Sequence, residues 1–161
     1  MQILTSLLLT AAAFLAVPVL AQDKGTTAAD TNMEILLQKV KADKKLLVAS
    51  NMDLTDAEAK TFWPLYDAYQ KELDKINQKL LKTIQDYAAA FNKGPIPNDQ
   101  AKMLLNEALS VQESEVKVKR EYADKVGKVL PAAKTARYIQ IENKIRAVLN
   151  AELAAQIPLV Y

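Results

Sequence analysis

The chain has 161 residues, half of them apolar and a quarter charged, which is enough for one domain with a core. It contains no His and no Cys, and this excludes disulfides, thiol chemistry, the usual catalytic triads and the commonest metal ligands. A formal net charge of +2 without a basic stripe argues against a nucleic-acid binder, and only 3 Gly among many Ala, Leu, Lys and Glu favour helices throughout.

The amino-terminal segment has the pattern of a targeting sequence. Residues 1–22 carry no charged side chain. An almost continuous apolar run, LLLTAAAFLAVPVL, leads into Ala21, and small residues stand at the positions that a signal peptidase reads. This pattern predicts a signal peptide over residues 1–21, cleaved after Ala21, and a periplasmic location. The alternative is an uncleaved membrane anchor, which would make the protein a membrane-bound scaffold. Residues 22–32 are small, polar and aperiodic, typical of a disordered leader.

A single helical domain is expected over residues 33–161. Its first segment, Met33–Ser50, has an amphipathic pattern with four lysines between the apolar positions, and Asn51–Asp53 interrupts it. The lysines indicate either a solvated face of a packed helix or a helix lying on a membrane surface.

The stretch Leu54–Phe91 predicts one long helix, about 54 Å at about 1.5 Å per residue. Thr55 and Glu58 have the spacing of a capping box. Pro64 predicts a kink near residues 60–62 or a loose first turn. Apolar residues then follow at steps of three and four: Phe62, Tyr66, Tyr69, Leu73, Ile76, Leu80, Ile84, Tyr87 and Phe91.

Two further helices follow. Asn92–Pro97 ends the long helix, and the next begins at Pro97 or Asn98 with an expected packing face of Ala101, Leu104, Leu105, Ala108 and Leu109. Its charge-rich middle, residues 112–121, either faces solvent or lines a groove. Gly127 and Pro131 mark another break before a last helix over Ala132–Ala155. The predicted fold is all-α: long antiparallel helices in a hairpin or bundle, three to four after the signal peptide, with an elongated shape.

Three helix starts are related: Leu54-Thr55-Asp56-Ala57-Glu58, Ile96-Pro97-Asn98-Asp99-Gln100 and Leu130-Pro131-Ala132-Ala133-Lys134. Over residues 54–155 the chain resembles the periplasmic Spy/CpxP proteins with their repeated LTxxQ motif. Leu54 and Thr55 match the motif and Gln100 keeps its Gln, whereas Glu58 and Lys134 depart from it. The resemblance implies a cradle-shaped homodimer that acts as an ATP-independent chaperone or restrains an envelope-stress sensor. That family's metal-binding members depend on His and Cys, which are absent here.

No catalytic constellation is visible in the sequence. There is no Gly-rich phosphate loop, and the i,i+2 carboxylate pairs do not share a helix face. We therefore expect a protein that is not an enzyme, with no cofactor and no metal. The candidate protein-binding residues are Phe62, Trp63, Tyr66, Tyr69, Arg137 and Glu142. For the aromatic four the alternatives are core or dimer packing and an apolar patch for unfolded clients. For Arg137 and Glu142 they are packing-side polar contacts and a recognition edge.

These features lead to two hypotheses. In the first, the protein is a non-enzymatic periplasmic protein that binds unfolded or envelope proteins, without nucleic acid and without a membrane if the signal peptide is cleaved. In the second, it is a structural or regulatory module that docks on one specific envelope partner, such as a sensor domain. The apolar Leu159-Val160-Tyr161 either packs back onto the helices or is read as a degradation signal.

Overall fold

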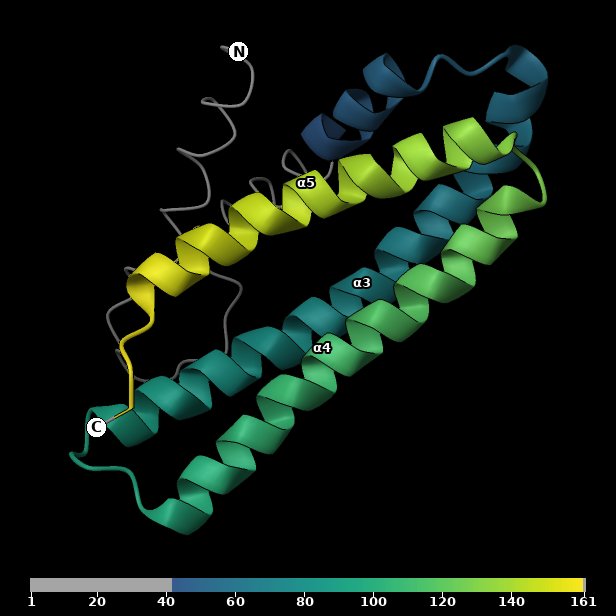
Figure 1. The fold of residues 1–161 in the computed structure, drawn as a ribbon. Coiled ribbons are helices and arrows are strands. Elements are labelled where there is room, and N and C mark those ends of the chain that lie inside the picture. The colour runs from purple at the N-terminus through teal and green to yellow at the C-terminus, as the bar shows by residue number, and fades with distance from the viewer. Residues whose placement is uncertain (1–41, 161) are drawn as a thin grey trace, which may run out of the picture. The chain divides into compact units, whose positions relative to one another are not determined.

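The computed structural model describes residues 42–160. This part of the chain contains no strand, and its four helical segments confirm the all-α fold of long helices (Figure 1). Residues 42–52 are helical and are followed by α3 (Asp56–Phe91), α4 (Asn98–Gly127) and α5 (Ala132–Gln156). The predicted signal peptide, the leader and residues 33–41 of the first predicted helix lie outside the described residues. None of the helices between residues 42 and 160 is both long and apolar enough to cross a membrane.

The described residues fall into two compact units. One contains residues 42–53 and Ile141–Gln156, and the other contains Leu54–Gln140 and residues 157–160. The second unit therefore holds α3, α4 and the first part of α5. Residues 157–160, which follow α5, belong to this second unit as well. They are called the strap below.

α3 begins as its sequence predicts. Thr55 is the N-cap: its hydroxyl accepts from the Glu58 N–H at 3.3 Å, and the Glu58 carboxylate accepts from the Thr55 N–H at 2.9 Å. Both bonds of the capping box are present, so a Thr and a Glu three residues apart correctly predicted where this helix begins. Pro64 had suggested a loose first turn as one alternative, and the intact capping box argues against it. The helix continues through Pro64, which has no backbone N–H to donate to the ladder.

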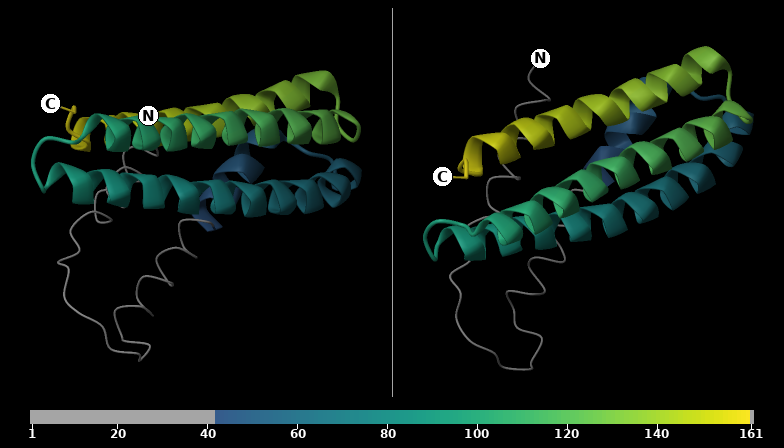
Figure 2. Two further views of the ribbon diagram at one scale, coloured as in Figure 1. Left: turned by 90° about the horizontal axis from the view of Figure 1, so that it is seen from below. Right: turned by 60° about the horizontal axis from the view of Figure 1, so that its bottom comes forward.

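α3 and α4 form an antiparallel hairpin, and all views show them side by side (Figures 1 and 2). The connection is short: the C-cap position of α3 is Asn92, and the N-cap position of α4 is Pro97. Within it Gly94 has φ of +114°, a left-handed conformation that disfavours any residue with a Cβ. α4 turns Val111, Tyr122 and Val126 inward.

Candidate protein-binding surface

The first half of α3 contributes an aromatic core. Phe62, Tyr66 and Tyr69 are buried, and so is Tyr138 of α5. The Tyr138 ring lies edge-on to Phe62 with 5.0 Å between ring centroids, and it lies 6.2 Å from both Tyr66 and Tyr69. Tyr122 of α4 completes the cluster, 5.2 Å from Tyr69. The contacts of Tyr138 with Phe62 and Tyr69 are edge-to-face, an arrangement that aromatic rings prefer at these distances.

This burial favours the packing interpretation of the four aromatic candidates. Trp63 is the most accessible of them: it is half-buried at the edge of the cluster, with its ring 5.0 Å from Phe62 and 5.4 Å from Tyr66. Tyr138 and its neighbour Ile139 could each fill this core position, and the structure buries Tyr138. An i,i+3/i+4 pattern cannot distinguish two neighbouring positions when both are apolar.

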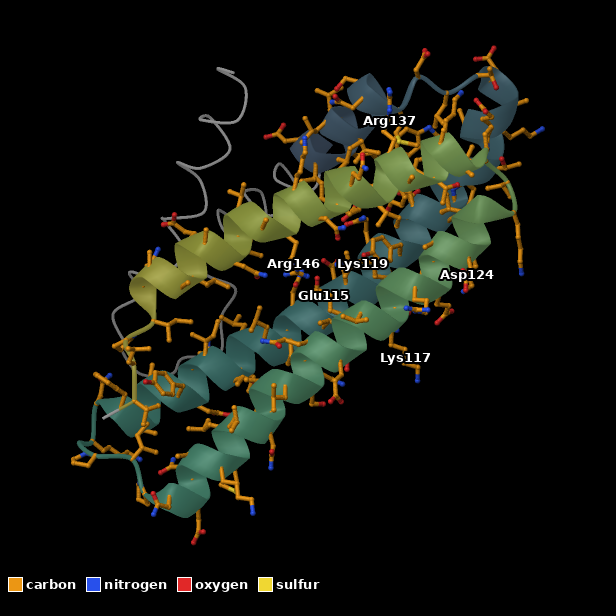
Figure 3. All side chains as sticks on the ribbon, viewed as in Figure 1. Glu115, Lys117, Lys119, Asp124, Arg137 and Arg146 are labelled. Atoms are coloured by element: carbon orange, nitrogen blue, oxygen red, sulfur yellow. The ribbon has the colours of Figure 1, made fainter. Side chains whose placement is uncertain are left out.

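The two polar candidates have different surroundings. Arg137 is exposed near the start of α5 (Figure 3). Glu142 is buried, at 4% exposure, and its carboxylate lies 2.9 Å from the Lys44 ammonium in the helical segment 42–52. A buried carboxylate that is paired in this way holds helices together, since an unpaired one would be strongly unfavourable. Within its unit, Glu142 thus has the role of a packing residue.

A second ion pair joins the starts of α3 and α5. The Lys134 ammonium lies 2.6 Å from the same Glu58 oxygen that closes the capping box. These contacts hold the pKa of Glu58 below its usual value of 4.5, first through the hydrogen bond from Lys134 and then through the backbone N–H of Thr55. The sequence pattern identified each residue as a helix-start position but gave no indication that the two would meet.

The apolar stripe of α3 changes character along the helix. Its first half, from Phe62 to Ile76, is buried, whereas the positions of its second half are only half-buried although they continue the same face. We call this second half the distal stripe, and its members are Leu80, Ile84, Tyr87 and Phe91. Within it the rings of Tyr87 and Phe91 are 5.9 Å apart. The distal stripe is therefore an apolar surface with incomplete cover.

One hydrogen bond joins the strap to this distal stripe. The Tyr87 hydroxyl donates a hydrogen bond to the Pro158 carbonyl at 2.8 Å. Ile157 is half-buried, whereas Leu159 and Val160 are 88% and 56% exposed. The Pro158 carbonyl is therefore attached to α3, whereas the Leu159 and Val160 side chains are largely exposed and are not packed onto the helices as one sequence-based alternative expected.

α4 exposes apolar side chains that the sequence assigned to packing. Leu105 and Leu109 are 58% and 45% exposed, and Val116, two turns further along the same face, is 59% exposed. The predicted packing face was too wide, because α3 covers a narrower arc of α4.

The charged middle of α4 is largely exposed, and Figure 3 shows Lys117 projecting from its outer edge, away from α3.

A shallow groove of about 300 Å³ lies between the end of α3 and the start of α4. Its floor includes Ala90 and Leu104, and its rim carries Asp86, Lys93 and Glu107. Lys82 is hydrogen-bonded to Asp86, and this contact raises the pKa of Lys82. Within residues 42–160 no acidic cluster is grouped closely enough to hold a metal ion.

Comparison with known proteins gives no relative from which a role could be transferred. No family model, curated protein or solved structure matches this chain.

Proposed function

We propose that this is a non-enzymatic periplasmic protein that binds other proteins, as a Spy/CpxP-like ATP-independent chaperone or envelope-stress accessory. The observation that carries the proposal is the amount of apolar surface left accessible on long, highly charged helices. Leu105, Leu109 and Val116 are exposed on α4, and the distal stripe of α3 is half-buried. Contiguous apolar surface with a polar rim is typical of protein-binding sites.

The proposed mechanism needs no nucleotide. Side chains of both signs surround the apolar residues, among them Lys102, Glu113 and Arg120 on α4. Such charges attract an unfolded segment over distances up to the Debye length, about 10 Å at 0.1 M salt, and apolar contacts then retain it. The periplasmic location rests on the sequence of residues 1–21, and a homodimer is part of the proposal through the resemblance alone.

The test is suppression of aggregation. The purified chain, with its amino terminus defined by intact mass, is added to a chemically unfolded model protein that is diluted out of denaturant, and light scattering is followed without nucleotide. We expect lower scattering in proportion to the amount of protein added. Undiminished scattering at a several-fold molar excess would contradict the proposal. Capture of one stoichiometric envelope partner without general protection would instead favour the regulatory alternative.

A further inference from the structure

The strap has the chemistry of a bound peptide. Its residues, Ile157-Pro158-Leu159-Val160, are apolar, and residues 158–160 are outside any helix. Pro158 disfavours the helical conformation at Ile157 and lacks a backbone donor, so the strap cannot extend α5. The strap is thus a short, non-helical apolar segment that contacts α3 through the Pro158 carbonyl.

The bond that fixes the strap does not depend on its side chains. Tyr87 donates to a backbone carbonyl, that of Pro158, at 2.8 Å. Every peptide offers such carbonyls, and an apolar side chain beside one would meet the half-buried surface that contains Tyr87 and Phe91. Recognition of this kind is tolerant of sequence, which is what binding of varied unfolded segments requires.

The strap is also weakly held. One neutral hydrogen bond shifts an equilibrium by about two- to twelvefold, and the two residues after Pro158 are exposed. By contrast, the start of α5 is held by the buried Tyr138 and by the ion pair of Lys134 with Glu58. An incoming peptide would therefore compete with a contact that opens readily.

We propose that the distal stripe of α3 is a binding site for extended apolar peptide segments of other proteins, and that the strap occupies it as a built-in competitor. This inference rests on the proposed function and names its site and the class of segment that it takes. A peptide can bind only those molecules in which the strap is open. Its apparent affinity is therefore its intrinsic affinity multiplied by the open fraction.

The test compares peptide binding by three forms of the full chain. The probe is a fluorescein-labelled, amidated peptide with the sequence of residues 154–160, Ala-Ala-Gln-Ile-Pro-Leu-Val, measured by fluorescence anisotropy. The strap variant Ile157→Ser/Pro158→Gly keeps the backbone carbonyl but removes the half-buried Ile157 side chain and the ring that stiffens the strap. Because the closed strap is weakened in this way, the variant should bind the peptide more tightly than wild type, by up to about tenfold. Adding Tyr87→Phe to the strap variant should weaken binding again by about two- to twelvefold.

A matched control is Leu81→Ser, which replaces a leucine of α3 that is 50% exposed and lies off the stripe. It should leave peptide affinity unchanged. Circular dichroism and the melting temperature establish that each variant is folded, and the strap substitutions lie outside every helix. A strap variant that is folded and binds the peptide no more tightly than wild type would overturn the inference.

A second probe separates this inference from the proposed function. The same variants are titrated with a fluorescent, reduced and carboxymethylated model protein, which stays unfolded. Tighter binding by the strap variant supports the inference. Binding by wild type that neither the strap nor Tyr87 affects leaves the proposed function standing and overturns the inference. If only the short peptide binds, the stripe takes the chain's own strap alone, which also overturns it. An absence of binding to either probe by any form contradicts the proposed function itself.

Discussion

Glu58 and Lys134, which occupy the same position in two related helix starts, form an ion pair with each other at 2.6 Å. They are separated by 76 residues, and one begins α3 whereas the other begins α5. The carboxylate at one helix start and the ammonium at the other attract each other. Because the carboxylate also closes the α3 capping box, a single side chain supports both helix starts.

This dual role predicts an order of stabilities. Lys134→Ala removes the ion pair and leaves the capping box intact, so it should lower the melting temperature slightly. Glu58→Ala removes both and should lower it more, while Thr55→Ala should cost about 0.5–2 kcal/mol, the range for the loss of an N-cap. Thermal unfolding followed by circular dichroism gives the order. Equal melting temperatures for the two charge variants would show that the capping-box contact of Glu58 contributes nothing.

The lowered pKa of Glu58 predicts a dependence of stability on pH. Because folding lowers this pKa, the native state binds fewer protons than the unfolded state near it, and the contribution is complete above the usual value of 4.5. It is lost as the pH falls through the lowered pKa of the folded state. The difference in melting temperature between wild type and Glu58→Gln should therefore be largest near neutral pH and shrink under acid. A difference that stays constant across this range would refute the assignment.

The aromatic core predicts a large loss on truncation. Phe62→Ala removes a fully buried ring that contacts Tyr138, and it should cost about 3–5 kcal/mol. Leu81→Ala is the matched control on the same helix, since Leu81 is exposed, and it should stay within about 0.5 kcal/mol of wild type. Urea unfolding provides both values. A small effect of Phe62→Ala would mean that this face of α3 is not the core.

The buried pair of Lys44 and Glu142 predicts an asymmetric response. Lys44→Met leaves the carboxylate of Glu142, only 3% exposed, without this cation and should cost about 3–5 kcal/mol. The double variant Lys44→Met/Glu142→Leu should recover much of that loss, because no buried charge remains. The exposed pair of Lys75 and Glu72 is the comparison, and Lys75→Met should cost at most about 1 kcal/mol. If the double variant were no more stable than Lys44→Met, the cost would not come from an uncompensated charge.

The exposed apolar face of α4 predicts a loss of function without a loss of fold. Leu105→Ser/Leu109→Ser/Val116→Ser should keep the helicity and the melting temperature close to wild type, because these side chains are already exposed. Because the proposed function assigns these side chains to the binding of unfolded proteins, the triple variant should suppress aggregation less than wild type. The matched control is Asn98→Ser/Asn106→Ser/Gln112→Ser, three exposed and uncharged polar positions of the same helix. Equal suppression by both triple variants would remove α4 from the binding surface.

Sequence periodicity located the helices well, and its limits have physical reasons. The capping box of Thr55 and the break at Asn92–Pro97 are local signals, so they marked the ends of α3 correctly. The exposure of Leu105 was missed because a helix pattern shows which residues share a face but not how much of that face a neighbour covers. The pairs Glu58–Lys134 and Tyr87–Pro158 join distant parts of the chain, and no local pattern encodes them.

The core that closes around Tyr138 also has a consequence for synthesis. A chain is made from its amino terminus, so α3 emerges with Phe62, Tyr66 and Tyr69 long before the residue that covers them. Until then the three rings form an exposed apolar surface on the nascent chain. The contacts that make the finished protein stable thus make its unfinished precursor prone to aggregate, and truncated products that end before Tyr138 should be found in the insoluble fraction.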